Sequence, residues 1–159
     1  MDTSDESQLR LREARTEDWR SLVAFNRAMA LETEGKELET GCLEAGIHAA
    51  LSDPERGRYF LAEQAGQAVA CLMLTKEWSD WRNGWYWWIQ SVFVAPEARA
   101  SGIFRRLYGH VIQLAREAGN VVGVRLYVDS ENRAAQSVYE ALGMSKSHYL
   151  MYELDLAGE

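Results

Sequence analysis

The stretch ARASGIFRRL, residues 98–107, combines small residues and arginines in a spacing that suits anion binding. It follows an apolar, β-branched run, and a helical pattern begins within it. The first four N–H groups of a helix have no intrahelical partner and lie at the positive end of the helix dipole. Small residues at 100–102 let a ligand approach these groups closely, while Arg99 and Arg105 add positive charge. The segment therefore predicts a phosphate or diphosphate site.

An ordinary strand-to-helix turn, with Ser101 capping the helix and the arginines in solvent, is the alternative interpretation of these residues. The segment lacks the Gly-Lys-Ser/Thr ending of a Walker loop. It also differs from a dinucleotide fingerprint, because it has one glycine and no acidic residue placed to hold a ribose. The turn by itself leaves both interpretations open.

Two further groups of side chains suit a cationic ligand. The segment ETEGKELE is either solvated surface or a cation-attracting rim over an acceptor site, and its glutamates are Glu32, Glu34, Glu37 and Glu39. Five of the six tryptophans lie within residues 78–88. Most of them are expected in the core or in a dimer interface. Trp78 and Trp81 precede the predicted strand, so they are the better candidates to wall an acceptor pocket, where ring faces attract cations.

The histidines and cysteines indicate neither a metal site nor a disulfide. The three histidines share no metal-ligand spacing, so no metal is expected. Cys71 lies in the apolar run VACLML and is predicted to be a buried thiol. Cys42 is the only other cysteine, and nothing in the sequence indicates secretion, so a structural disulfide is not expected.

The overall composition indicates one cytoplasmic globular domain. The chain has 159 residues, 47% of them hydrophobic, which suits a single domain over residues 1–159 with residues 1–8 frayed. The net charge of −7 argues against non-specific nucleic-acid binding and is compatible with a cationic acceptor. No run approaches the roughly 20 apolar residues of a membrane span, and the polar, acidic start is unlike a signal peptide.

Hydrophobic periodicity predicts the order β-α-α-β-β-β-α-β-α-β. The predicted strands are a short one from Leu9 and residues 58–64, 68–75, 85–94, 122–128 and 147–156. The predicted helices are residues 17–31 after a Thr16 cap, a second helix capped by Thr40, residues 103–118 before the Gly119 stop, and residues 130–143. This order predicts an α/β sheet covered by helices on both faces.

Two motifs resemble those of the GNAT family of N-acetyltransferases. VFVAPEARASGIFRRL resembles the family's acetyl-CoA signature, Arg/Gln-x-x-Gly-x-Gly/Ala. Arg99 and Gly102 match this signature, whereas Phe104 stands where the family usually has a small residue. ENRAAQSVYEALGM resembles the family's last helix, and its matching residues are Asn132, Ala135, Tyr139, Gly143 and Met144. The two motifs occur in the family's order, and the resemblance spans residues 9–154.

This resemblance implies the GNAT fold, in which a mixed, mostly antiparallel sheet splays between its fourth and fifth strands. Acetyl-CoA would lie in the splay, where the pantetheine amides pair with strand groups left without sheet partners. A backbone N–H there would also stabilise the developing oxyanion. The implied cofactor-binding residues are Val92, Phe93, Val94, Arg99, Ala100, Ser101, Gly102, Ile103, Phe104, Arg105, Asn132 and Ala135. At Phe104 we expect altered packing rather than lost binding.

The resemblance also implies the catalytic roles. Tyr139 would be the acid that protonates the departing thiolate, whereas its pattern alone would place it in the core. Asn132 would both cap its helix and bind the pantetheine. WSDWRNGWYWWIQSVFV further resembles the spermidine and diamine acetyltransferase branch, although Gln90 and Ser91 replace two acidic residues there. Because glutamine accepts no proton at neutral pH, deprotonation would run through water or a carboxylate such as Glu32 or Glu34, or the amine would bind already neutral.

We therefore expect an acetyl-CoA-dependent N-acetyltransferase acting on a small primary amine, with Glu32, Glu34, Trp78, Trp81 and Gln90 as candidate acceptor-binding residues. One alternative is a protein N-terminal or lysine acetyltransferase, which needs an open peptide groove. A second alternative is a non-catalytic acyl-CoA sensor. The replacement of the branch's acidic residue by Gln90 allows this alternative, whereas the presence of Tyr139 argues against it. By resemblance to the branch, the chain is expected to form a homodimer.

Overall fold

The computed structural model describes residues 8–158 of the chain. The fraying expected for residues 1–8 falls outside the described residues except for Gln8, which is exposed. The chain divides into two compact units, residues 1–127 and residues 128–159. Among the described residues, the first unit contains the sheet and three α-helices, and the second contains one α-helix.

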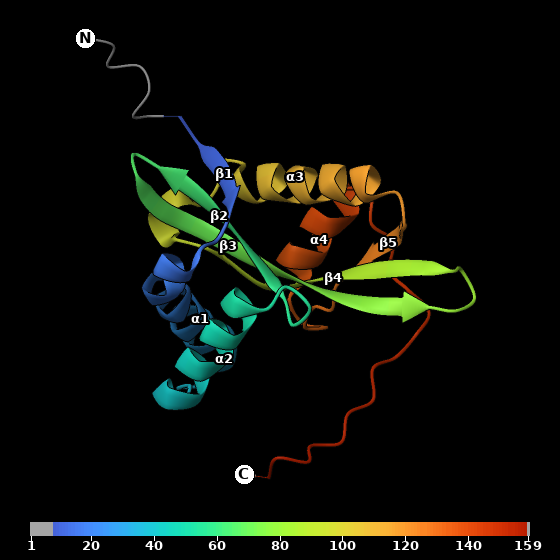
Figure 1. Cartoon of the computed structure of the whole chain (residues 1–159), viewed down its shortest axis with the longest axis horizontal. Coiled ribbons are helices and arrows are strands. Elements are labelled where there is room, and N and C mark those ends of the chain that lie inside the picture. Colours follow the sequence, from blue (N-terminus) through green and yellow to red (C-terminus); the bar gives the residue numbers. More distant parts are fainter. Residues whose placement is uncertain (1–7, 159) are drawn as a thin grey trace. The chain divides into compact units, whose positions relative to one another are not determined.

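The first unit is built on a mixed five-stranded sheet in the order β1-β2-β3-β4-β5 (Figure 1). Neighbouring strands are antiparallel except β4 and β5, which are parallel, so the expected mixed and mostly antiparallel sheet is confirmed. The strands are β1 (Arg10–Glu13), β2 (Arg58–Gln64), β3 (Gln67–Ser79), β4 (Gly84–Val94) and β5 (Val121–Arg125).

Helices cover both faces of this sheet. The helices α1 (Trp19–Glu34) and α2 (Thr40–Ser52) lie on one side, and α3 (Ile103–Ala118) lies on the other (Figure 1). The predicted stripe on α3 is confirmed, because these four residues are all buried: Ile103, Leu107, Val111 and Ala115. From the opposite face, Leu22 and Ile47 complete the core against sheet residues such as Phe60 and Leu72.

The predicted hairpin between β2 and β3 is also present. Its two turn residues, Ala65 and Gly66, have φ angles of 51° and 73°. Two consecutive residues with positive φ match the twist of the flanking strands, which explains why a two-residue turn suffices. The strand β3 continues to Ser79, beyond the predicted end at Thr75, because residues 76–79 pair with the aromatic start of β4.

The helix caps expected at Thr16 and Thr40 were both wrong. Thr16 lies in a 3₁₀ turn (Thr16–Asp18), and α1 begins only at Trp19. Thr40 is the first residue of α2, and the cap is Glu39, whose carboxylate accepts from the amides of Gly41 (2.9 Å) and Cys42 (2.6 Å). A glutamate reaches back over the first turn here, a geometry that the usual preference for short capping side chains does not anticipate.

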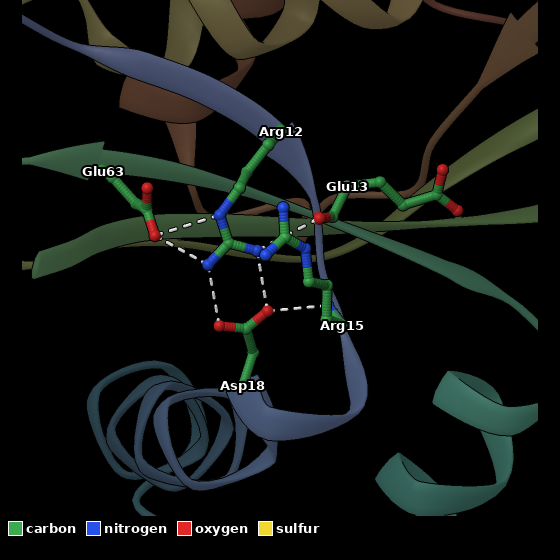
Figure 2. Close-up of polar contacts among 5 residues, drawn as sticks. All are labelled: Arg12, Glu13, Arg15, Asp18 and Glu63. Atoms are coloured by element: carbon green, nitrogen blue, oxygen red, sulfur yellow. Dashed lines mark hydrogen bonds and ion pairs between the residues drawn. The ribbon is translucent and has the colours of Figure 1, made fainter. Parts of the chain in front are cut away.

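A network around Arg12 explains the delayed start of α1. The Arg12 guanidinium donates to both oxygens of Asp18 (2.8 Å each) and to Glu63 on β2 (2.6 Å), while Asp18 also accepts from the amide of Arg15 at 2.6 Å (Figure 2). Hydrogen bonding to Arg12 holds the pKa of the Asp18 carboxyl below its usual range. The network thereby ties β1, β2 and the entry to α1 together.

The second unit contains the helix α4 (Arg133–Ala141) and an extended segment. The Asn132 side chain accepts from the amide of Ala135 at 3.0 Å, so the expected cap is confirmed. The strand predicted over residues 147–156 is absent, since residues 145–158 form neither helix nor strand. An alternating pattern becomes a strand only when a partner supplies the ladder hydrogen bonds, and no described residue pairs with this segment.

Candidate active site

The strand β4 is paired on two sides along its first half and on one side along its second. Among the described residues, β5 pairs with β4 only from Trp85 to Trp88, whereas β3 pairs with β4 as far as Val94. We call residues 89–94 the open half of β4. This is the splay that was expected between the fourth and fifth strands.

The open half presents main-chain groups toward its uncovered edge. The Ala95 amide donates to the carbonyl of Val69 on the β3 side, and the Phe93 amide contacts the sulfur of Cys71 on that same side. Because successive residues of a strand direct their N–H groups to opposite edges, the amides of Val92 and Val94 face the open edge. Amide-bearing chains are suited to this edge, since they both donate and accept as a strand does.

A bulge at Ser91 lies within the open half. Phe93 pairs with Cys71 and Gln90 with Met73, so two residues of β4 oppose one residue of β3. Ser91 has a φ of 51°, the left-handed conformation of an extra residue in a bulge. The bulge changes the direction of β4 shortly after Trp88, the last residue that pairs with β5.

Buried polar groups hold this bulge from the core side. The Ser91 carbonyl accepts from the Cys71 thiol at 3.4 Å, and the Ser91 side chain is hydrogen-bonded to the hydroxyl of Tyr59. Tyr59 also bonds to Asn26, a buried residue of α1 that donates to the Leu22 carbonyl at 2.9 Å. Burial raises the pKa of Tyr59, so its hydroxyl stays protonated and remains a donor.

Sequence reasoning did not single out Tyr59 or Asn26. Both belong to ordinary apolar patterns of a strand and a helix, and no short motif marks them. The prediction of a buried Cys71 thiol is confirmed. Burial raises the pKa of this thiol to about 12, and both cysteines are free.

The turn after β4 carries positive φ angles at two small residues, Ala100 (62°) and Gly102 (78°). The Ser101 hydroxyl donates to the Ala98 carbonyl at 2.6 Å, so it is not the helix cap of the alternative interpretation. Gly102 is the N-cap of α3, and the first helical bond runs from the Arg106 amide to its carbonyl. The amides of the first turn thus lie at the positive helix end without a capping side chain from Gly102.

Arg99 links the turn to α1 while its side chain remains partly exposed to solvent. Its Nε donates to the Val94 carbonyl at 2.9 Å, and an Nη donates to Glu32 at 2.7 Å. Its guanidinium also lies 5.6 Å from the centre of the Phe93 ring. The structure therefore brings together three predicted cofactor-binding residues, and it neutralises Glu32, a glutamate of the expected acidic rim. The charge on Arg105 is exposed.

The predicted acceptor residues lie in the β3–β4 hairpin and near the end of α1. Trp78 packs edge-on against Trp85 at 4.9 Å between ring centres, whereas Trp81 at the hairpin turn is 92% exposed. Gln90 donates to the Thr75 hydroxyl at 2.6 Å. Glu34 ends α1 and is exposed.

Ion pairs and ring contacts also stiffen the paired half of the sheet. Arg125 of β5 donates to Glu77 of β3 at 2.6 Å and lies 3.6 Å from the centre of the Tyr86 ring on β4. These contacts join three strands across the aromatic end, and sequence reasoning did not predict them.

In the second unit, α4 carries the remaining predicted residues. Asn132 and Ala135 are joined by the cap bond, and Tyr139 lies half-buried on the helix. Burial raises the pKa of the Tyr139 hydroxyl above its usual range, so the phenol holds its proton at neutral pH. Such a group can serve as a proton donor.

Within residues 8–158, no group of three or more potential metal ligands comes together. No helix in the same range has the length and apolar character to cross a membrane.

The chain is similar to known acetyltransferases over most of its length. Residues 10–144 match the model of the Acetyltransferase (GNAT) family. A possible acetyltransferase from Clostridium difficile 630 shares 43% identity, with 93% of this chain and 97% of that chain covered and a TM-score of 0.88. No curated protein matches this chain.

Two solved structures with lower identity are similar in fold. A predicted acetyltransferase with acetyl-CoA from Clostridium acetobutylicum has a TM-score of 0.77 at 20% identity, covering 94% of this chain and 97% of that chain. A ribosomal-protein-alanine N-acetyltransferase from Brucella melitensis biovar Abortus 2308 has a TM-score of 0.76 at 12% identity, covering 94% and 99% respectively.

Proposed function

Because this chain belongs to the GNAT acetyltransferase family, an enzyme family that uses acetyl-CoA, we propose that it acetylates the primary amine of a small cationic metabolite. The acceptor classes are a polyamine, a diamine or an amino-acid-like amine, nearest the spermidine and diamine branch. The observation that carries the proposal is the one-sided pairing of β4, followed by a turn with positive φ angles at Ala100 and Gly102 that leads into the N-terminus of α3.

The residues present fit acetyl-CoA. The open-edge amides of Val92 and Val94 suit the pantetheine amides, and the first-turn amides from Gly102 to Arg105 suit a diphosphate. Acetyl-CoA supplies an acetyl group activated as a thioester. An open-edge amide of β4 would stabilise negative charge on the thioester oxygen as the amine attacks. Arg99 acts here by holding the turn against Val94 and Glu32.

The second unit supplies the acid in this proposal. In this proposal Tyr139 would donate its proton to the sulfur of acetyl-CoA, so that the thiol can leave while the amine nitrogen bonds to the acetyl carbon. Its raised pKa supports this role, because the proton-bearing form persists through neutral pH. Asn132 caps α4 and also binds the pantetheine, with Ala135 beside it in the helix's first turn.

The base is a water molecule or a carboxylate rather than Gln90. The Gln90 amide is hydrogen-bonded to Thr75, and an amide accepts no proton at neutral pH. Of the two candidate carboxylates, Glu32 is paired with Arg99, so Glu34 is the better candidate. Alternatively, the amine binds after losing its proton to solvent.

Charge and aromatic surface support a cationic acceptor. The net charge of −7 favours the approach of a cation, and the exposed faces of Trp78 and Trp81 offer cation–π contacts. We further propose a homodimer working in the cytoplasm as one domain. Two free cysteines fit a reducing compartment.

An acceptor screen tests the proposal. Thiol release from acetyl-CoA is measured with polyamines, diamines, amino acids and peptides with free N-termini or lysines. We expect turnover with a small cationic amine and about a 100-fold lower kcat for Tyr139→Phe, the scale of general acid catalysis. Because burial raises the pKa of the Tyr139 hydroxyl, loss of its proton should not reduce activity at neutral or mildly alkaline pH.

Other outcomes of the screen overturn parts of this proposal. Turnover confined to peptides would indicate a protein acetyltransferase. Acetyl-CoA binding without thiol release from any amine would indicate a sensor. An unchanged kcat for Tyr139→Phe at saturating amine would remove Tyr139 as the acid.

A further inference from the structure

The Arg99 side chain closes the far end of the open edge of β4. In a strand, the N–H and C=O of one residue point to the same edge, so the Val94 carbonyl faces the open edge together with the Val94 amide. The Nε of Arg99 donates to this carbonyl at 2.9 Å. A guanidinium N–H therefore stands where a neighbouring strand would place a donor, and the open edge ends at this bond.

Two side-chain hydrogen bonds constrain the turn that leads from β4 into α3. The bond from Arg99 to Val94 closes the loop that contains the 3₁₀ turn Pro96–Ala98. Further along, the Ser101 hydroxyl donates to the Ala98 carbonyl at 2.6 Å. Both bonds precede the first-turn amides of α3, so they constrain the backbone path that presents these amides.

Glu32 of α1 holds the Arg99 side chain from outside the turn. One Nη of Arg99 donates to the Glu32 carboxylate at 2.7 Å, and the guanidinium lies 5.6 Å from the centre of the Phe93 ring. Phe93 in turn contacts Phe25 of α1, with 5.2 Å between the ring centres. Arg99 thus bridges β4 and α1, and Glu32 provides its polar contact on the α1 side.

The exposure of this ion pair separates its role from fold stability. The side chains of Arg99 and Glu32 are 45% and 43% exposed. Ion pairs this exposed contribute little to folding, because water solvates both charges. The contact still restricts the arginine side chain, and a turn that is already ordered loses less freedom when a ligand binds.

We propose that Glu32 is a positioning residue for acetyl-CoA. Its carboxylate holds Arg99 against Val94 and thereby keeps the first-turn amides of α3 in the arrangement that a diphosphate needs. Glu32 itself contacts neither the cofactor nor the acceptor. This inference rests on the proposed cofactor site, and it assigns Glu32 to that site rather than to the acidic rim.

The expected effect of removing this carboxylate has the opposite sign to simple electrostatics. Acetyl-CoA is an anion, so the loss of a negative charge near its site should strengthen binding or leave it unchanged. Loss of the contact that holds Arg99 should weaken binding instead. A neutral substitution at Glu32 therefore separates the two effects.

Calorimetry of acetyl-CoA binding to the full-length chain measures this sign. We expect Glu32→Gln to raise the Kd about fivefold, because the turn must then be ordered on binding. Glu97→Gln is the matched control, since Glu97 is an exposed glutamate of the same turn, two residues before Arg99. It should leave the Kd unchanged or lower it. An unchanged or lower Kd for Glu32→Gln overturns the inference.

A double substitution tests whether Glu32 acts through Arg99. Lysine keeps the charge at position 99 but lacks the planar fork that reaches two acceptors at once. In an Arg99→Lys chain, the further change Glu32→Gln should alter the Kd by less than about twofold, because the contact is already lost. The full effect of Glu32→Gln in both chains would mean that Glu32 acts independently of Arg99, contrary to the proposal.

The acceptor KM distinguishes this role from a place in the acidic rim. At saturating acetyl-CoA, Glu32→Gln should leave the KM of a cationic acceptor unchanged. The Tm should fall by no more than about 4 °C, as expected for an exposed ion pair. A raised acceptor KM with an unchanged acetyl-CoA Kd would assign Glu32 to the rim, and a larger fall in Tm would assign it to the fold. Either result overturns the inference.

Gly102→Ala keeps this test separate from the test of the cofactor site. A weaker acetyl-CoA affinity for Gly102→Ala, with an unchanged Kd for Glu32→Gln, would overturn only the role of Glu32. If neither substitution changes the Kd, the diphosphate binds elsewhere, and the proposed cofactor site fails together with the role of Glu32.

Discussion

The two halves of β4 belong to one strand and serve different purposes. Residues 84–88 lie between β3 and β5 and are joined across the sheet by Tyr86, Arg125 and Glu77. Residues 89–94 are paired by β3 alone, and a bulge at Ser91 lies within this second half. The first half stabilises the sheet through side chains, and the second exposes main chain. Substitutions in the two regions should therefore change different measurements.

The largest expected effect is on stability, from Gly123→Ala in the paired half. A Cβ at Gly123 would lie 2.6 Å and 2.9 Å from two carbons of the Tyr86 ring. That ring cannot move away easily, because Arg125 covers it and Arg82 donates to its hydroxyl at 3.0 Å. Overpacking of this kind costs about 1–3 kcal/mol. For a chain of 159 residues, each kcal/mol lowers the Tm by about 2–4 °C, so we expect the Tm to fall by roughly 2–12 °C in calorimetry.

Gly46→Ala is the matched control for this substitution. No heavy atom lies within 4 Å of a Cβ at Gly46, which is inside α2. Replacing a helical glycine by alanine stabilises by about 0.5–1 kcal/mol, so the Tm should stay level or rise. Acetyl-CoA affinity should be unchanged in both variants. An undiminished Tm for Gly123→Ala would mean that the paired half is loosely packed.

The next effect is on cofactor binding, from Gly102→Ala in the turn that follows the open half. Gly102 has a φ of 78°, and a Cβ there meets nothing within 4 Å in the chain. In the proposed cofactor site, a methyl group at this position would stand where the diphosphate approaches the first-turn amides. We expect about a tenfold rise in the acetyl-CoA Kd by calorimetry, equal to about 1.4 kcal/mol.

Gly119→Ala at the other end of α3 controls for backbone strain. Gly119 has a φ of 77° and equally open surroundings, so the alanine suffers the same left-handed strain of about 1–2 kcal/mol. The two variants should lose similar stability, and only Gly102→Ala should lose affinity. Equal affinities would place the diphosphate elsewhere and remove the main support for the cofactor site.

Local sequence patterns predicted most of the helices, strands and turns. They did not predict the contacts between residues that lie far apart in the sequence. The α3 stripe, the hairpin at Ala65 and the Asn132 cap depend on neighbours in sequence, and all three are confirmed. The pairing of Arg99 with Glu32 joins residues 67 positions apart, and no spacing rule encodes it. The strand expected over residues 147–156 failed for the same reason, because a ladder depends on a partner that local alternation does not specify.

The smallest expected effect comes from Tyr59→Phe beneath the bulge, and it tests whether the open half is held in shape from the core. The substitution removes a buried hydroxyl that is hydrogen-bonded to Asn26 and Ser91. We expect the free energy of unfolding to fall by about 1 kcal/mol. If the bulge loosens and all of this free energy is lost from binding, the acetyl-CoA Kd should rise by up to about fivefold. This follows because about 1.4 kcal/mol of binding free energy corresponds to a tenfold change in Kd.

Tyr108→Phe, at a half-buried tyrosine of α3, should change neither stability nor affinity appreciably, and it controls for the loss of a phenol hydroxyl. The Tyr59→Phe effect should be constant from pH 6 to 9, because a phenol with a pKa raised above about 10 stays neutral there and adds no proton linkage. A variant that loses stability but keeps its full acetyl-CoA affinity would show that β3 pairing alone shapes the open half. The buried polar contacts would then serve the fold and not the cofactor.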